Sequence, residues 1–202
     1  MSSAVRSVQV EVEASELDAP AADHGEDLYT NHFNFVWRNL RRLGVPAPQL
    51  EDAAQDVFLT AHRRWDSYDS QRASPQSWLF GIALRVARDY RRTFRRRLAR
   101  LVSLGEGREA EASSEIESPA AIVERRQSLV LLDRILETID EDKRAVLLLV
   151  DVEELSVTEA ADVLGVNLNT LYWRLRVARQ SFQRGVERLR LTEARTQGGA
   201  LR

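Results

Sequence analysis

The residues best equipped for chemistry in this chain are arginines, and they gather in one segment. Between Arg85 and Arg100 there are eight arginines and a single acid. Guanidinium groups bind phosphate oxygens through paired, charge-assisted hydrogen bonds, so this run indicates a surface for a polyanion. Aromatic side chains beside a basic groove are typical of sites that stack the bases of single-stranded nucleic acid. Five aromatic residues lie close to the run in the sequence: Tyr68, Trp78, Phe80, Tyr90 and Phe94.

Both features also have a purely structural explanation. A charged run is commonly the solvated face of a helix. Trp78 and Phe80 are more often core residues than platforms for bases, because large aromatic side chains bury much apolar surface. The sequence leaves these explanations open.

A second candidate for nucleic-acid binding is a helix-turn-helix between Ser156 and Phe182. Ser156 and Glu159 have the spacing of a capping box, which begins a helix. Gly165 is the residue type that ends a helix in the left-handed conformation, and Asn167 can cap the next helix. In DNA-binding proteins the second helix enters the major groove, although an ordinary helical hairpin with a basic face has the same pattern. The candidate DNA contacts on this helix are Asn169, Thr170, Tyr172, Trp173, Arg174, Arg176 and Arg179.

Other classes of site find little support in the residue types. The chain has no cysteine, which excludes disulfides, thiolate nucleophiles and cysteine-based zinc sites. An enzyme would have to use Asp52, Asp56 and His62, but His62 lies about 240° around the helix from Asp56. No second helix offers partner ligands of the kind found in di-metal carboxylate bundles. We therefore expect no catalytic site, no metal and no cofactor.

The elements that must position the candidate residues are helices. Apolar residues recur at three-to-four spacing, and no β–α–β alternation indicates a sheet. Residues 1–25 are acidic and rich in alanine, and predict a disordered leader. Residues 26–100 predict a helical block, whose third helix begins with Ser74 as the cap and Pro75 in the first turn. This third helix carries the arginine run.

A second helical block follows a change in composition. Residues 101–120 concentrate serine, glycine, glutamate and alanine, and predict a flexible acidic linker. Residues 121–191 predict further helices that end in the helix-turn-helix, and residues 192–202 a frayed, disordered tail. The expected fold class is all-α, with two small helical domains. Domains this small are marginally stable, which is consistent with docking on a larger partner.

The order of these features resembles the extracytoplasmic-function (ECF) sigma factors of bacterial RNA polymerase. Three stretches carry the likeness: DAAQDVFLTAHRRW (Asp52–Trp65), SWLFGIALRVARDYRR (Ser77–Arg92) and LSVTEAADVLGVNLNTLYWRLRVAR (Leu155–Arg179). The resemblance implies a sigma region 2-like domain over residues 26–100 and a sigma region 4-like domain over residues 121–191. It also implies a subunit that binds core polymerase, recognises the −10 and −35 promoter elements and helps to open the duplex.

The resemblance implies a role for each candidate surface. One helix would dock on core polymerase with side chains on its non-core face: Asp52, Gln55, Asp56, Leu59 and Arg63. The loop Asp66–Gln76 would capture a flipped base of the −10 element, and the arginine helix would hold the backbone of the melted strand. The −10 candidates are Tyr68, Trp78, Arg85, Arg88, Arg91, Arg92, Arg95 and Arg96. The helix-turn-helix residues named above would read the −35 element.

The implied partners are therefore core RNA polymerase and promoter DNA, and family members are commonly held inactive by an anti-sigma factor. The chain has neither a secretory signal nor an apolar run of membrane-spanning length, so we expect a cytoplasmic protein without membrane insertion. Tyr172 and Trp173 stand where the family usually has a basic and a small residue, which leaves the −35 preference open. The rival interpretation is a helix-turn-helix regulator that binds duplex DNA without polymerase.

Overall fold

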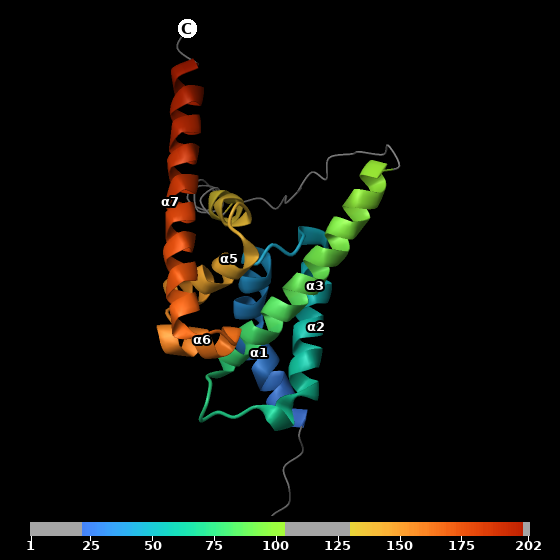
Figure 1. Cartoon of the computed structure of the whole chain (residues 1–202). Helices are drawn as coiled ribbons and strands as arrows, with labels where there is room; N and C mark the ends of the chain where they lie inside the picture. Colours follow the sequence, from blue (N-terminus) through green and yellow to red (C-terminus); the bar gives the residue numbers. More distant parts are fainter. Residues whose placement is uncertain (1–21, 104–129, 200–202) are drawn as a thin grey trace, which may run out of the picture.

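A computed structural model describes residues 22–103 and 130–199 of the chain (Figure 1). The named helices are α1 (Ala22–Arg42), α2 (Leu50–Arg63), α3 (Pro75–Ser103), α5 (Glu141–Leu147), α6 (Val157–Leu164) and α7 (Leu168–Gly199). Residues 130–137 are also helical. Shorter elements are the 3-10 turns Ala47–Gln49 and Trp65–Ser67 and a π-helical stretch, Leu148–Val152.

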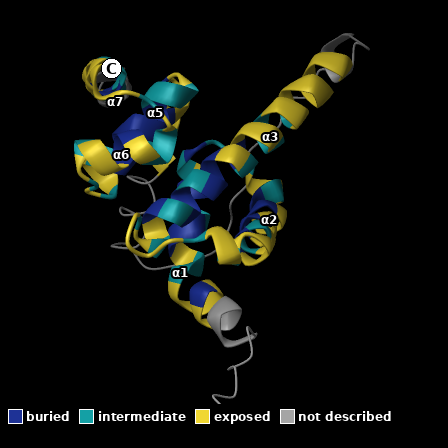
Figure 2. Cartoon of the chain, turned by 60° about the horizontal axis from the view of Figure 1, so that its bottom comes forward, coloured by how far each residue is buried: buried dark blue, intermediate teal, exposed yellow. Residues whose placement is uncertain are grey.

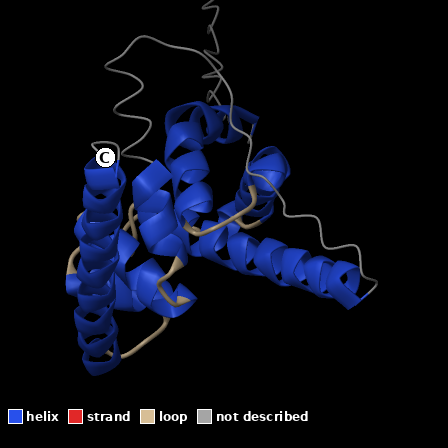
Figure 3. Ribbon diagram, turned by 90° about the horizontal axis from the view of Figure 1, so that it is seen from above, coloured by secondary structure: helices blue, strands red, loops and turns tan. Residues whose placement is uncertain are grey.

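The structure confirms the all-α fold class. Over the two described ranges every regular element is helical and none is a strand (Figure 3). α1, α2 and α3 pack against one another and form the first domain, while α5 and α6 both pack against α7 in the second. The predicted flexible segment between the domains lies mostly outside the described residues, as does the predicted leader up to residue 21.

The capping residues begin the helices where the sequence predicts. At the start of α3, Ser74 Oγ accepts a hydrogen bond from Ser77 N at 3.2 Å. At the start of α6, Ser156 Oγ accepts from Glu159 N at 3.2 Å, and Glu159 Oε2 accepts from Ser156 N at 3.0 Å. These bonds satisfy amide groups that the first turn of a helix leaves without partners.

Replacing Ser156 with alanine is expected to lower the free energy of unfolding by about 1 kcal/mol, because the cap is lost. The hydrogen bonds from Ser156 lower the pKa of the Glu159 carboxyl below its ordinary value of 4.5. A lowered pKa means that this stabilisation is present above pH 4.5 and is lost as the pH falls through the lowered value. Urea unfolding of Ser156→Ala and the parent chain over this pH range measures both effects.

The matched control for this experiment is Thr158→Ala, an exposed position in the same turn. It should change stability by less than about 0.5 kcal/mol, as surface substitutions usually do. An equal loss at both positions, or a Ser156→Ala deficit that does not shrink in acid, would contradict the assignment.

Two helix ends differ from the predictions. α7 runs unbroken to Gly199, so residues 192–199 are helical and the prediction of a disordered tail over 192–202 is wrong for them. The physical reason is that extending an existing helix adds one hydrogen bond for each residue fixed, and the tail contains no proline to stop it. α3 likewise continues to Ser103, into the segment assigned to the linker.

The two domains share one buried apolar core. Its members run from Leu28 in α1 to Ala178 in α7, and the buried surfaces of both halves face inward (Figure 2). α6 lies against α3, where a Cβ placed on Gly81 would be 3.7 Å from Val163 Cγ1. The outer half of α3, in contrast, projects away from the bundle and is exposed (Figure 2). The core therefore holds the start of α3 and presents its arginine-rich end to solvent.

Candidate nucleic-acid interface

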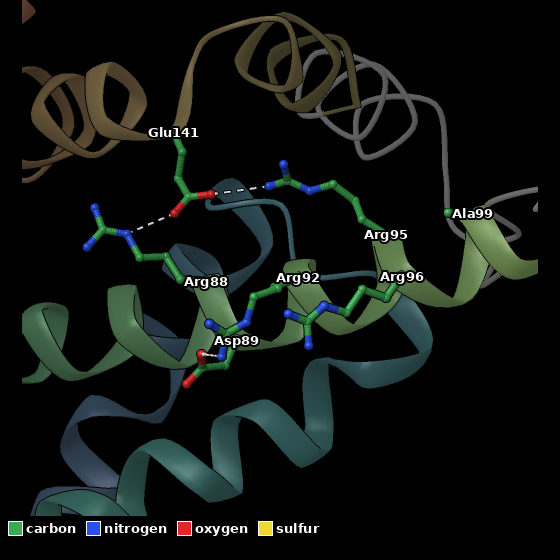
Figure 4. A pocket seen from close by; sticks show the side chains of 7 residues that line it. All are labelled: Arg88, Asp89, Arg92, Arg95, Arg96, Ala99 and Glu141. Carbon is green, nitrogen blue, oxygen red and sulfur yellow. Dashed lines mark hydrogen bonds and ion pairs between the residues drawn. The ribbon is translucent and has the colours of Figure 1, made fainter.

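The arginines of α3 form one side of a groove with a volume of about 490 Å³. In Figure 4 the arginines project from α3, and Glu141 reaches toward them from the start of α5. The residues that line this groove, hereafter the α3 groove, are Arg88, Asp89, Arg92, Arg95, Arg96, Ala99 and Glu141. The groove thus brings together four of the predicted −10 residues.

Glu141 is the centre of an ion-pair network across the α3 groove. Its Oε1 accepts a hydrogen bond from Arg88 Nε at 2.8 Å. Its Oε2 lies 3.2 Å from Arg91 Nη1 and 3.4 Å from Arg95 Nη2. One carboxylate therefore occupies the point where three guanidinium groups converge, which is also a geometry suited to a phosphate group.

The remaining −10 arginines differ in how firmly the fold holds them. Arg91 Nη1 also donates to Leu43 O at 3.2 Å, and burial lowers the pKa of Arg91. Arg92 pairs with Asp89 at 2.8 Å within α3. Arg85 and Arg96 are exposed and have no ion pair with any residue that the structure describes. Arg91 consequently also has a structural role, whereas Arg85 and Arg96 face solvent.

Two of the predicted aromatic residues, Tyr68 and Trp78, form a ring cluster with Trp65, and a third, Phe80, lies in the core. The rings of Trp65, Tyr68 and Trp78 lie with their centroids 4.8–6.0 Å apart. Tyr68 OH donates to Ala73 O at 3.1 Å, and burial raises the pKa of Tyr68. Phe80, in contrast, is completely buried. The structural explanation is therefore correct for Phe80, while Tyr68, directly after the 3-10 turn Trp65–Ser67, and Trp78, at the start of α3, remain partly accessible.

The predicted polymerase-docking residues lie together on the solvent side of α2. Its core side consists of Leu50, Ala53, Ala54, Val57 and Ala61. The five candidates are exposed: Asp52, Gln55, Asp56, Leu59 and Arg63. Leu59 is apolar and 44 % exposed. The docking candidates therefore form one continuous face without a role in the core.

Asp56 has a partner that the sequence analysis missed. Tyr90 OH donates to Asp56 Oδ2 at 2.8 Å, and this contact joins α2 to α3. Burial and the hydrogen bond to Asp56 raise the pKa of Tyr90 to about 12. No spacing rule connects residues 34 positions apart, so only the tertiary structure reveals the pair.

The structure confirms the local geometry of the helix-turn-helix. Gly165 ends α6 with a φ of 64°, in the left-handed region. Asn167 Oδ1 then accepts from Thr170 N at 2.8 Å and begins α7. The buried side of α7 is apolar and contains Leu171, Leu175 and Ala178. The two bulky aromatic residues, Tyr172 and Trp173, are 57 % and 59 % exposed, and they point away from this core.

The arginines of α7 have acidic partners that the sequence analysis did not identify. Arg174 Nη2 lies 2.6 Å from Asp142 Oδ2. Arg179 makes a two-pronged contact with Asp151, at 2.9 Å through Nε and 2.6 Å through Nη2, which raises the pKa of Arg179. Arg176 is exposed and has no ion pair within the described ranges. The exposed residues Asn169, Tyr172, Trp173 and Arg176 therefore form an accessible face.

Other kinds of site are not supported in this part of the chain. Residues 22–103 and 130–199 contain no group of three metal-ligating side chains that could hold an ion. Over the same ranges, no helix has both the length and the apolar character required to cross a membrane.

Two family models match the two domains in order. Residues 28–97 match Sigma-70 region 2, and residues 129–182 match Sigma-70, region 4. The chain is 30% identical to RNA polymerase sigma factor NccH of Alcaligenes xylosoxydans xylosoxydans, over 75% of this chain and 81% of that protein. It is 32% identical to RNA polymerase sigma factor CnrH of Cupriavidus metallidurans, over 69% and 74% of the two chains. It is 28% identical to the ECF RNA polymerase sigma-E factor of Escherichia coli K12, over 72% and 78%.

Two solved structures have the same fold. One is CnrH in complex with the cytosolic domain of CnrY, with a TM-score of 0.58, 24% identity, and coverage of 83% of this chain and 94% of that one. The other is the sigma factor RpoE in complex with the anti-sigma factor NepR from Bartonella quintana, with a TM-score of 0.61, 19% identity, and coverage of 82% and 97%. The two family models match the domains in the order described above, and the chain belongs to the ECF RNA polymerase sigma factors.

Proposed function

We propose that this sigma factor binds core RNA polymerase through the exposed face of α2 and recognises promoters through the α3 groove and α7. The observation that carries the proposal is the combination of two basic surfaces on separate domains. One lies on the outer half of α3, and the other on the helix that follows the turn at Gly165. A bipartite promoter requires two such surfaces on one chain.

The α3 groove is suited to the melted strand of the −10 element. Its guanidinium groups can follow a phosphate backbone, and the cluster of Trp65, Tyr68 and Trp78 lies at the start of the same helix. Stacking on aromatic rings and phosphate contacts together offset the cost of unstacking a base. The chain thereby assists duplex opening without a bond-making step, so we propose no catalytic group.

The accessible face of α7 is suited to the major groove of the −35 element. Arg176 is able to contact phosphate or a guanine edge, and Asn169 an adenine edge. Tyr172 and Trp173 offer apolar surface for thymine methyl groups. The aromatic pair therefore favours an element that contains thymine.

Further partners follow from the relatives. The solved structures of CnrH and RpoE each contain a second protein, CnrY and the anti-sigma factor NepR. By this likeness we propose an anti-sigma factor as a partner of the present chain, and the cytoplasm as its place of action.

Run-off transcription with bacterial core polymerase, with and without this chain, tests the function on a pool of promoter fragments from its own genome. We expect discrete transcripts only when the chain is present. Their absence, together with failure of the chain to co-migrate with core polymerase on a sizing column, would refute the proposal. Tight, specific binding to duplex DNA without polymerase would favour the free-standing regulator instead.

A charge-removal experiment tests the assignment of the α3 groove. Replacing both Arg92 and Arg96 with alanine should weaken the promoter complex and make its salt dependence shallower. The slope of the logarithm of the association constant against the logarithm of the salt concentration should change by about 0.7 for each single-strand phosphate that the variant no longer neutralises. The control is Arg38→Ala with Arg184→Ala, two exposed arginines outside the groove. The same change in slope for both variants would remove the assigned role.

A further inference from the structure

The single lysine of the chain lies against the exposed face of α7. Lys143 is in the first turn of α5, and its Nζ is 5.8 Å from the centroid of the Trp173 ring. At this distance the negative face of an aromatic ring attracts a cation. Because α5 packs against α7 within the second domain, the contact belongs to the internal structure of that domain.

Trp173 occupies the centre of the exposed side of α7. It lies about 200° around the helix from Leu171, which is completely buried, so the indole points almost directly away from the core. Asn169 and Arg176 are exposed on the same side. An indole that is 59% exposed in the middle of a polar face contributes little to folding and is placed to meet a partner.

The first turn of α5 fixes two consecutive side chains of α7. Lys143 lies over Trp173, and Asp142 Oδ2 is 2.6 Å from Arg174 Nη2. The side chains of Lys143 and Arg174 are only 25% and 22% exposed. The ring of Tyr172, in contrast, has no cation over it within the described part of the chain. Of the two aromatic residues, Trp173 is therefore the one whose position α5 determines.

The charge of Lys143 is directed at its neighbours within the domain. Its Nζ lies 3.8 Å from Asp140 Oδ1, so the ammonium group is held between a carboxylate and the indole ring. A carboxylate this close offsets much of the attraction that the ammonium would have for a phosphate group. The geometry thus favours an action of Lys143 on the ring over a direct contact with DNA.

We propose that Lys143 is a positioning residue for −35 recognition, which holds the indole of Trp173 so that the ring contacts a thymine methyl group. The proposal deepens the function proposed above and rests on it. Thymine is the one base that presents a methyl group in the major groove, and an apolar ring recognises it without a hydrogen bond. A ring that is already fixed before binding loses less conformational freedom when it meets the DNA.

Removal of the methyl groups tests the contact directly. Deoxyuridine replaces every thymine of the −35 element on both strands, in a promoter obtained from the run-off experiment, which leaves all hydrogen-bonding groups in place. The chain bound to core polymerase should then bind the promoter about fourfold more weakly for each methyl group that the ring covers, the equivalent of one CH2 group removed from water. Trp173→Ala should bind both promoters equally.

Substitutions of Lys143 test the positioning role. In Lys143→Met the preference for thymine should fall to about twofold or less, because a cation over an exposed ring contributes a factor of about two to five. Lys143→Arg retains a cation and should restore the preference. The matched control is Arg184→Met, which removes an exposed positive charge from α7 outside the reading face and should keep the full preference. A full preference in Lys143→Met would overturn the proposal.

Salt dependence distinguishes positioning from a phosphate contact. If Lys143 neutralised a phosphate, Lys143→Met would weaken binding equally to the thymine and deoxyuridine promoters. The slope of the logarithm of the association constant against that of the salt concentration would also change by about 0.9. We expect an unchanged slope and a loss confined to the thymine promoter. The opposite pair of results would overturn the proposal.

The single lysine also provides a readout without DNA. Reductive methylation with 13C-formaldehyde labels Lys143 and keeps its charge, whereas arginine side chains do not react. The ring current of Trp173 should shift the methyl signals of Lys143 upfield, and Trp173→Leu should abolish this shift. Tyr172→Leu is the control and should leave the shift in place. An unshifted signal in the parent chain would show that the contact with the ring is absent, and would overturn the proposal.

The failure of this inference can be told apart from the failure of the proposed function. Transcription that requires thymine in the −35 element but is indifferent to its methyl group would overturn the role of Trp173 and Lys143, while the chain remains a promoter-specificity subunit. Absence of any promoter-directed transcription with the parent chain would instead refute the proposed function.

Discussion

Replacing Phe80 with alanine is expected to lower the free energy of unfolding by about 3–5 kcal/mol. The side chain is completely buried at the start of α3. The alanine variant therefore loses the free energy gained by transferring the ring out of water, and it leaves a cavity whose lining loses packing contacts. A loss of this size approaches the whole stability of a small helical domain. Urea unfolding followed by circular dichroism measures it.

The control for Phe80 is Leu98→Ala on the same helix, where the side chain is 41% exposed. It should change the unfolding free energy by less than about 0.5 kcal/mol. A mild effect at Phe80, accompanied by a selective loss of single-stranded DNA binding, would show that the ring acts as a base platform and not as part of the core.

Gly44→Ala is expected to destabilise the protein by about 3 kcal/mol, the sum of backbone strain and the displacement of a buried cation. Gly44 has a φ of 87°, which residues with a Cβ rarely adopt. A Cβ there would lie 2.7 Å from Arg144 Nη1. The guanidinium group would have to shift, although its Nη2 donates to Glu137 O at 3.1 Å and Ile139 O at 3.0 Å.

Gly165→Ala separates the two contributions to this loss. Gly165 is also left-handed, with a φ of 64°, but a Cβ there would meet no atom within 4 Å. The control should therefore show only the backbone strain, about 1–2 kcal/mol. Thermal or urea unfolding of both variants gives the difference between them. Equal losses would mean that Arg144 adjusts without cost and that the contact with Gly44 does not restrict the turn.

The local features of the fold were predictable from the sequence. Helix caps and apolar stripes depend on residues three or four positions apart, which is why Ser74, Ser156 and Asn167 occupy the expected positions. The solvent side of α2 followed from the same periodicity. The resemblance to sigma factors then supplied the roles of these surfaces, which neither spacing nor charge alone identifies.

The features that could not be predicted depend on distant parts of the chain. Glu141 meets Arg95 across 46 positions, and Asp56 meets Tyr90 across 34. Periodicity identifies which face of a helix is polar, but it does not identify the partner of that face. Burial was similarly ambiguous for Trp78 and Phe80, since residues two positions apart on a helix lie on different faces. Only the packing of α3 against its neighbours separates the half-buried Trp78 from the fully buried Phe80.

The apolar core common to both domains has a calorimetric consequence. Separation of the halves would hydrate the surface between Gly81 and Val163, where α3 meets α6. Exposing apolar surface raises the heat capacity by about 0.45 cal/K/mol for each Å². Docking on a polymerase buries surface and lowers it. An assembly that separates the halves while docking on polymerase would therefore have a less negative heat capacity change than the docked area alone implies.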